Sequence, residues 1–178
     1  MNSHHEETLE IFGALLDGFA KACLNLNIVA GRQASELTQS IEMLQWYPYQ
    51  RLRDLENTVF TSYSNSGPIL EKVGVQMMWA WYHFGPGQQI LKDGVDFLHF
   101  QSSSNGYASV VKGPQSEVGD FKLMELDPQR GTALIHSTTP FNKDLERGVI
   151  IGGMEAPGDL DYVDVVHEGD GYFRIEFH

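Results

Sequence analysis

The sequence contains a single cysteine, Cys23, so no disulfide can form within the chain. A chain of 178 residues buries roughly 70% of its unfolded surface, and it needs neither a disulfide nor a structural metal to fold. Cys23 lies on an apolar helical pattern, which favours an unreactive thiol in the core over a reactive one. These features predict one domain in a reducing compartment.

Positive charge is scarce, because 12 Lys and Arg stand against 24 Asp and Glu, for a formal net charge of −12. Nucleic acids and anionic membranes are bound through basic surfaces, so this balance argues against both as direct partners. The sequence also lacks an apolar run long enough to span a bilayer, and its start, MNSHHEETLE, lacks the regions of a signal peptide. We therefore expect a cytoplasmic protein.

Motifs for catalysis and metal binding are missing as well. The seven histidines form no His-x₃-His pair, and no Cys-x₂-Cys pair exists, which argues against structural zinc. The sequence has no Gly-x-Ser-x-Gly nucleophile elbow, no P-loop and no dinucleotide-binding pattern. Its carboxylates fall mostly on polar helix faces and in turns, where solvated surface is the ordinary role. We expect a protein that is not an enzyme.

Helical periodicity dominates the N-terminal part of the sequence. Apolar residues at spacings of three and four form a stripe along 6–26, and the stretch 69–83 is apolar almost all round, so we expect the latter to be buried on most of its surface. The predicted helices are 6–26, 33–45, 49–63, 69–83 and 88–100.

Alternation of apolar and polar residues takes over in the C-terminal part. A hairpin around the turn DPQRG is predicted for residues 121–126 and 132–138. A second hairpin, around EGDG, is predicted for residues 162–167 and 172–177. A helical spacing over 140–152 separates the two hairpins. Helices followed by β-β-α-β-β predict an α+β domain with a four-stranded antiparallel sheet.

The aromatic stretch MMWAWYHF, residues 77–84, begins within the predicted helix 69–83 and ends one residue after it. Trp and Tyr need partners for their polar atoms when they are buried, so their functional interpretation is the wall of an apolar small-molecule pocket. A bulky core without a ligand is the alternative, and a lone histidine in such a helix is more often a hydrogen-bonded core residue. The residues predicted to bind a ligand are Trp79, Tyr82 and His83, with Phe100 and Ser137 opposite.

Several stretches from about residue 40 onward carry a family resemblance: WYPYQRLRDL at 46–55, GPILEKVGVQMMWAWYHFGPGQQIL at 67–91, DFLHF at 96–100, VVKG at 110–113 and FKLMELDPQRGTALIHSTTPF from 121. With the order of the predicted elements, they resemble the heme nitric-oxide/oxygen-binding (H-NOX) fold and its heme-free relatives, which include the 4-vinyl-reductase-type small-molecule-binding domains. The resemblance is one of pattern over most of the chain. It implies a sensory domain, with bacterial signalling as its setting.

The H-NOX family binds the heme propionates through a Tyr-x-Ser-x-Arg motif, which this sequence lacks. At the matching positions Ile135 replaces the tyrosine and Thr139 the arginine, and Ser137 alone is kept. Loss of the arginine removes the bidentate charge partner for a carboxylate. Aligning VVKG places Ser104 near the family's axial histidine, with His99 about one turn earlier, so the candidate axial ligand if heme is bound is His99, with His83 as the alternative. The resemblance therefore predicts no cofactor, with heme as the alternative.

These observations predict a single domain, 1–178, in which 1–35 is a helical extension and 36–178 is the H-NOX-like ligand-binding part. The leading hypothesis is a non-enzymatic sensory domain that binds a small apolar molecule. The alternatives are a protein-interaction or scaffold module without a ligand, and a heme-based gas sensor with a non-standard site. The stripe along 6–26 would be a large apolar patch if exposed, so we expect a homodimer formed through it. A signalling protein is a further candidate partner.

Overall fold

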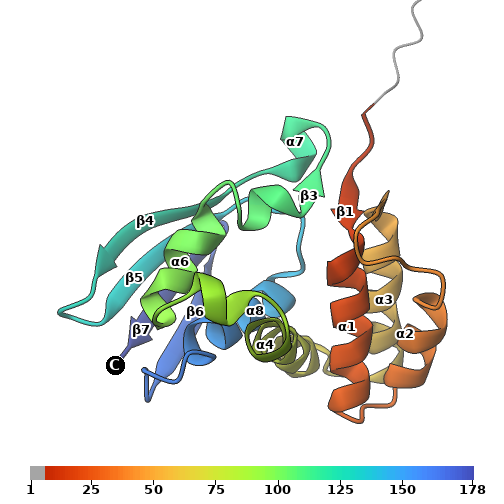
Figure 1. The fold of residues 1–178 in the computed structure, drawn as a ribbon, viewed down its shortest axis with the longest axis horizontal. Coiled ribbons are helices and arrows are strands. Elements are labelled where there is room, and N and C mark those ends of the chain that lie inside the picture. Colours follow the sequence, from red (N-terminus) through yellow and green to blue (C-terminus); the bar gives the residue numbers. More distant parts are fainter. Residues whose placement is uncertain (1–6) are drawn as a thin grey trace, which may run out of the picture.

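A computed structural model describes residues 7–178 as an α+β fold with two antiparallel sheets (Figure 1). The predicted α+β class is therefore confirmed. His4 and His5 lie outside the described residues. The N-terminal elements are β1 (Glu10–Phe12), α1 (Gly13–Asn25), α2 (Gly31–Leu37), β2 (Trp46–Pro48), α3 (Gln50–Ser62), α4 (Gly67–Phe84) and α5 (Gly87–Ile90). The C-terminal elements are α6 (Gly94–Ser102), η1 (Tyr107–Ser109), β3 (Val111–Lys112), α7 (Gln115–Val118), β4 (Phe121–Asp127), β5 (Thr132–Ser137), α8 (Lys143–Glu155), β6 (Val163–Gly169) and β7 (Tyr172–Phe177).

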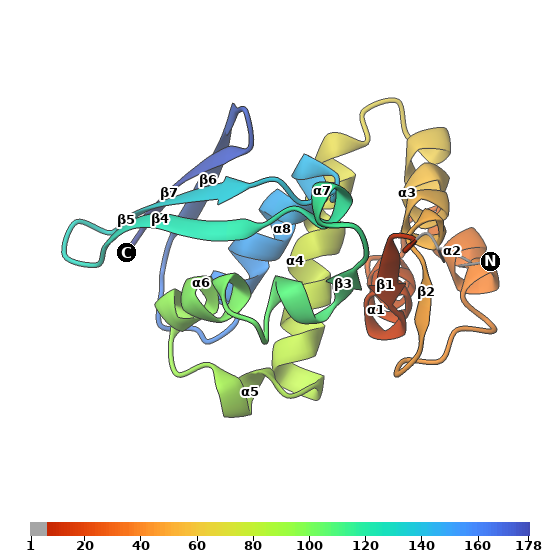
Figure 2. The same cartoon turned by 90° about the horizontal axis from the view of Figure 1, so that it is seen from above.

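The helices α1, α2 and α3 form one side of the molecule and the four-stranded sheet forms the other, with α4 and α8 between them (Figures 1 and 2). Helices α6 and α8 pack against the inner face of the sheet. That face contributes buried apolar residues at every second position, as alternation requires. No helix within residues 7–178 combines the length and the apolar character needed to cross a membrane.

Both predicted hairpins are present in the C-terminal sheet, with α8 between them, but β1, β2 and β3 interrupt the helices that are predicted to precede a single four-stranded sheet. The strand order across the sheet is β4-β5-β7-β6. Both hairpin turns use glycines with positive φ, 66° at Gly131 and 79° at Gly171, which other residues adopt only with strain. A second sheet, β2-β1-β3, was not predicted, because strands of two or three residues are too short to show alternation.

Helix α1 begins at Gly13 rather than at residue 6, where the prediction placed it. The preceding residues form β1, in which Ile11 pairs with Tyr47 of β2 and Val111 of β3. A side chain at Gly13 would overlap the carbonyl oxygen of Glu42, so the chain passes close to another backbone here. Residues 9 and 12 fit the helical spacing, but sheet pairing determines their conformation.

The apolar stripe of α1 packs inside the chain. Leu16, Phe19 and Cys23 are completely buried, and α1 contacts α2, α3 and α4. The premise that this stripe would be exposed is therefore wrong, because the chain's own helices cover it. A homodimer would have to use a different surface.

Two other predicted helices are shorter than expected. The helix predicted over 33–45 ends at Leu37, where the Thr38 hydroxyl bonds back to the carbonyl oxygens of Ala34 and Ser35. The helix predicted over 88–100 is split into α5 and α6. Asp93 begins α6 because its carboxylate accepts a hydrogen bond from the backbone N–H of Asp96, as an N-cap does.

Helix α4 is less buried than its apolar sequence predicts. Its fully buried residues are Leu70, Val73 and Gly74, all in the part that crosses α8. Towards its C-terminus the side chains emerge, so that 42% of Trp79 and 80% of Phe84 are exposed. The prediction of nearly complete burial is wrong: the close backbone contacts with α8 lie around Glu71, Gly74 and Val75, and aromatic side chains near the C-terminus of α4 are exposed.

Candidate functional site

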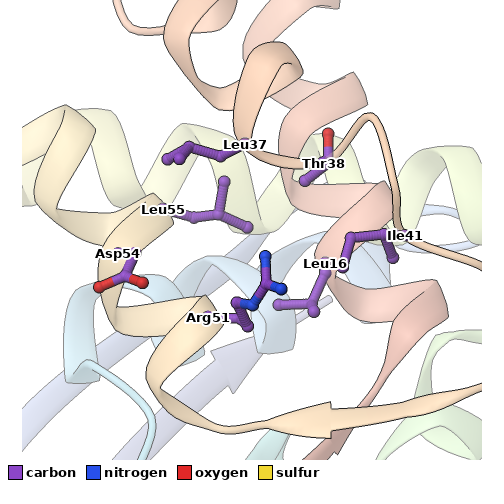
Figure 3. Close-up of a pocket in the computed structure, with 7 residues that line it drawn as sticks. All are labelled: Leu16, Leu37, Thr38, Ile41, Arg51, Asp54 and Leu55. Carbon is purple, nitrogen blue, oxygen red and sulfur yellow. The ribbon is translucent and has the colours of Figure 1, made fainter.

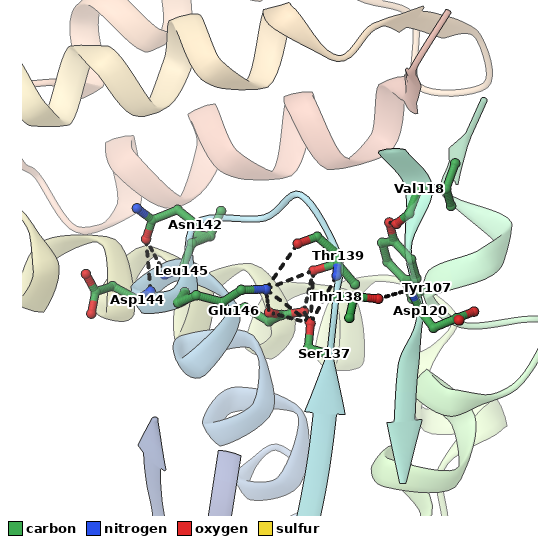
Figure 4. A network of polar contacts seen from close by, with 11 residues as sticks. Tyr107, Val118, Asp120, Ser137, Thr138, Thr139, Asn142, Asp144, Leu145 and Glu146 are labelled. Carbon is green, nitrogen blue, oxygen red and sulfur yellow. Dashed lines mark hydrogen bonds and ion pairs between the residues drawn. The ribbon is translucent and has the colours of Figure 1, made fainter. Parts of the chain in front are cut away.

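A buried polar cluster lies where β5 ends and α8 begins (Figure 4). The carboxylate of Glu146 is at its centre. The Ser137 hydroxyl lies 2.8 and 2.9 Å from the two carboxylate oxygens, and the Thr139 hydroxyl donates to Oε1 at 2.7 Å. The Lys143 ammonium donates to Oε2 at 2.8 Å and also to the Thr139 carbonyl oxygen at 3.1 Å.

Burial makes these contacts strong. Ser137 and Glu146 are each 2% exposed and Thr139 is 5% exposed. An ionised carboxylate withdrawn from water costs several kcal/mol unless it is paired and hydrogen-bonded, and here two hydroxyls and one ammonium satisfy it. The Lys143 side chain is 29% exposed, so its charge remains partly hydrated while it pairs with Glu146.

The connection between β5 and α8 is fixed on both sides of this cluster. The Thr138 backbone N–H donates to the Asp120 carbonyl oxygen at 2.9 Å, and the Asp120 N–H donates to the Thr138 hydroxyl at 2.8 Å. Asn142 caps α8, because its Oδ1 accepts from the N–H groups of Asp144 and Leu145. Adjacent residues of the sheet and the helix therefore hold Ser137, Thr139 and Lys143 in place.

A second buried polar group lies between α3 and this connection. Among the described residues, the hydroxyl of Tyr49 and the Oε1 atom of Glu56 have no hydrogen-bond partner, although the residues are 2% and 7% exposed. Burial raises the pKa of Glu56 to about 7, against the lowering effects of Arg53 and of a backbone hydrogen bond from Asn142. Burial also raises the pKa of the Tyr49 hydroxyl.

Three of the five predicted ligand-binding residues lie together. The rings of Trp79 and His83 are 4.4 Å apart, and those of Tyr82 and His83 are 5.1 Å apart. These three residues lie near the C-terminal end of α4, where both Trp79 and His83 are exposed. Phe100 instead stacks on Trp81 at 5.2 Å, and Ser137 belongs to the Glu146 cluster. The structure thus divides the predicted residues among three environments.

Two small pockets within residues 7–178 involve none of the predicted ligand-binding residues. One has a volume of about 20 Å³ and lies between α1, α3 and the end of α2 (Figure 3). The other, of about 180 Å³, lies at the β4–β5 hairpin. The first is lined by Leu16, Leu37, Thr38, Ile41, Arg51, Asp54 and Leu55, and the second by Glu125, Leu126, Asp127, Arg130, Thr132, Ala133 and Arg174.

The residues present do not fit heme in the way the H-NOX resemblance describes. Sites for ligands of drug size or larger occupy about 300–1,000 Å³, more than either pocket provides. His99 is exposed on α6, whose buried residues include Phe97 and Leu98. Ile135, at the position of the family's tyrosine, is completely buried in the core. The hydroxyl groups that remain at the motif hold Glu146 instead of an external carboxylate.

A metal site made by the chain alone is likewise without support in the described region, which contains no group of three or more His, Cys, Asp or Glu side chains placed to hold an ion. The buried polar clusters also contain three residues that were not predicted, Lys143, Glu146 and Glu56. Lys143 and Glu146 lie three residues apart at the start of α8 and follow Ser137 and Thr139 closely in the sequence. That closeness in sequence was the available signal for a shared polar cluster. Nothing in the pattern of α3 distinguishes Glu56 from a surface carboxylate.

Comparison with known proteins identifies the fold. No family model matches the sequence, and no curated protein matches it either. Among solved structures, an oxygen-binding H-NOX domain related to soluble guanylate cyclases, in its oxygen complex, has a TM-score of 0.66 at 17% identity. That match covers 93% of this chain and 94% of the other. A mutant H-NOX domain of T. tengcongensis has a TM-score of 0.64 at 17% identity, covering 93% and 96%.

A third H-NOX structure, described in terms of the mechanism of H-NOX activation, has a TM-score of 0.67 at 16% identity and covers 94% of this chain and 96% of the other. The chain therefore has an H-NOX-like fold. The coverage is too large to leave out all of 1–35, so the likeness extends into the segment that was predicted to be an extension.

Proposed function

We propose that this chain is a non-enzymatic regulatory domain that works without heme and acts through contact with a signalling protein. The regulatory part of the proposal is supported by the fold, since a similar structure is an oxygen-binding domain related to soluble guanylate cyclases. The contacts of Glu146, the small pockets and the exposed His99 support independence from heme.

Exposed aromatic side chains on α4 are the observation that carries the protein-contact part. We call Trp79, Tyr82, His83 and Phe84 the α4 aromatic cluster. The ring centroid of Trp79 lies 4.4 Å from that of His83 and 5.5 Å from that of Phe84. Of the two larger rings, Trp79 is 42% exposed and Phe84 is 80% exposed. Aromatic residues of this kind dominate the binding energy of protein interfaces.

The partner that fits is a protein with an apolar surface bordered by basic residues. Residues 73–84 contain no Asp, Glu, Lys or Arg, so this stretch of α4 carries no formal charge on a molecule of net charge −12. Basic residues around the partner's contact surface would be attracted by that overall charge. A small apolar ligand ranks second, because the aromatic residues predicted to enclose it lie partly in solvent and the pockets are elsewhere.

Heme independence is tested by titrating the purified protein with heme and recording its absorbance. We expect no sharp Soret band that saturates at one equivalent, because the propionate-binding position is satisfied by Glu146. A band that saturates at one equivalent in the parent protein and is lost in His99→Ala would overturn this part of the proposal.

The protein contact is tested with a double variant of the cluster, Trp79→Ala with Phe84→Ala. A partner recovered with the parent protein is purified, and its affinity is measured for parent and variant. We expect at least about a tenfold loss, the effect of removing an interface hot spot. The matched control is Met124→Ala with Val166→Ala, which removes exposed apolar side chains from the sheet instead.

Equal affinities for the parent and the cluster variant would contradict the proposal. Sedimentation of the parent protein alone tests whether the predicted homodimer forms. Self-association that the cluster variant loses would show that the occupant is a second copy of this chain rather than a different protein.

A further inference from the structure

We propose that Ser137, Thr139 and Lys143 form a carboxylate-binding cradle, and that the chain's own Glu146 is its resident ligand. Once the Glu146 carboxylate is removed, a small external carboxylate takes its place. This inference does not depend on the α4 aromatic cluster or on the identity of a partner.

The donors of the cradle match the shape of a carboxylate. The Thr139 hydroxyl donates to Oε1 of Glu146 at 2.7 Å, and the Lys143 ammonium donates to Oε2 at 2.8 Å. The Ser137 hydroxyl lies within 2.9 Å of both oxygens. Each oxygen therefore has its own donor and shares a third. Charge-assisted hydrogen bonds of this length are about twice as strong as neutral ones.

The donors are also held in place independently of Glu146. Ser137 is the last residue of β5, where its backbone N–H donates to the Gly171 carbonyl oxygen at 2.8 Å. The ammonium of Lys143 is held by the Thr139 carbonyl oxygen at 3.1 Å and the Ser137 hydroxyl at 3.2 Å. Donors that keep their positions when the carboxylate is absent form a binding site, because little order has to be created on binding.

The place of the cradle in the fold supports the same conclusion. Ser137 stands at the position where the H-NOX resemblance places a residue that binds a ligand carboxylate, and the structure puts the chain's own carboxylate there. The resident Glu146 connects the end of β5 to the first turns of α8 without any external ligand.

The test is chemical rescue of Glu146→Ala in the full chain. The alanine keeps Cβ and removes a CH₂–COO⁻ group, so acetate supplies the missing atoms. We expect a lower unfolding temperature in the variant and a saturable rise of about 3–6 °C in acetate, the size of ligand stabilisation near ten times Kd for a chain of this length. Sodium chloride at equal ionic strength should give a smaller rise without saturation.

Two variants show whether the rescue comes from the cradle. Glu146→Ala combined with Lys143→Met should lose the acetate effect, because the ammonium is gone. Glu146→Gln fills the space with a neutral side chain and should also give no acetate-specific rise. The parent protein should show none, because Glu146 occupies the cradle.

Two results would overturn the inference. One is a folded Glu146→Ala variant that acetate and formate stabilise no more than chloride does. The other is an acetate-specific rise in Glu146→Ala that appears at the same size in the parent protein and in the double variant. If Glu146→Ala does not fold in buffer, the yield of refolding from urea in acetate against chloride gives the same decision, and equal yields would count against the cradle.

Discussion

Glu56 has a buried carboxyl group with incomplete hydrogen bonding. It is 7% exposed, and its Oε1 atom lacks a partner among the described residues. Burial disfavours the charged form, which raises the pKa of Glu56 from 4.5 to about 7, while Arg53 and the Asn142 backbone oppose the shift. The folded state therefore binds the Glu56 proton more tightly than the unfolded state does.

The free energy of unfolding should consequently depend on pH through Glu56. Below pH 4.5 both states hold the proton, and the contribution is fully present. As the pH rises towards 7 the unfolded state releases its proton first, so stability falls, by about 3 kcal/mol in total for a pKa difference of this size. Urea denaturation at a series of pH values measures it.

Glu56→Gln is the control for this dependence, because the amide stays neutral across the range. The difference in unfolding free energy between variant and parent should shift in favour of the variant as the pH rises from 4.5 to 7. Parallel pH curves for the two proteins would show that Glu56 titrates alike in the folded and unfolded states.

The two tryptophans of α4 provide a matched pair at the residue scale. Trp81 is half-buried and stacks on Phe100, whereas Trp79 is 42% exposed. We expect Trp81→Ala to lower the free energy of unfolding by about 3 kcal/mol and Trp79→Ala by about half as much, because fewer atoms pack around an exposed ring. Chemical denaturation of both variants measures the difference, and an equal or larger loss at Trp79 would mean that its ring is packed in solution.

At the scale of elements, the crossing of α4 and α8 depends on glycine. A side chain at Gly148 would overlap the Glu71 carbonyl oxygen, and one at Gly152 would lie 2.6 Å from the Val75 carbonyl oxygen. Because the obstructing atoms belong to a helix backbone, they cannot move aside without shifting α4. The two helices that separate the N-terminal helices from the sheet are therefore in direct backbone contact.

Gly148→Ala should therefore destabilise the protein, by about 3 kcal/mol or more, as overpacking of a close contact does. Gly18→Ala in α1 is the matched control, because its new methyl group would meet just the Met77 Cε atom, at an ordinary 3.8 Å. That variant should gain about 0.5–1 kcal/mol from the higher helix propensity of alanine. Equal effects of the two substitutions in urea denaturation would refute the backbone-contact explanation.

Elements with a long periodic pattern could be predicted from the sequence, and short or context-dependent ones could not. The four strands of the C-terminal sheet were found because alternation and glycine turns agree over six or seven residues. Strand β1 was taken as part of a helix, because three residues show no period and their pairing partners are distant in the sequence. The end of α2 depends on hydrogen bonds of Thr38 that periodicity does not reveal.

The candidate site shows the same limit. Ser137 was identified from the resemblance, yet its contact with Glu146 depends on how β5 meets α8, which is a tertiary feature. The aromatic residues of α4 were recognised as unusual, and Trp79, Tyr82 and His83 do lie together. Their exposure depends on which elements pack around the C-terminal end of α4, and the sequence of α4 alone contains no information about that.

At the scale of the whole molecule, the N-terminal segment is built into the core. Strand β1 lies between β2 and β3, so residues from three distant parts of the chain share one small sheet. Ile11, Leu16, Phe19 and Cys23 are all completely buried. Each fully buried side chain of this size contributes about 1.5–3 kcal/mol, so together they approach the net stability of about 5–15 kcal/mol of an ordinary domain.

Deletion of 1–35 should therefore abolish cooperative folding, although these residues were predicted to be an extension of a domain that begins at 36. The deletion removes β1 from between β2 and β3 and exposes the faces of α3 and α4 that α1 covers. Far-ultraviolet circular dichroism with urea denaturation measures the result, and we expect a broad transition without a stable baseline. Deletion of 1–6 is the control, because it removes none of the described contacts and should leave the transition sharp. A sharp transition for the chain 36–178 would establish that this part is a domain by itself, and that the N-terminal helices are an addition to it.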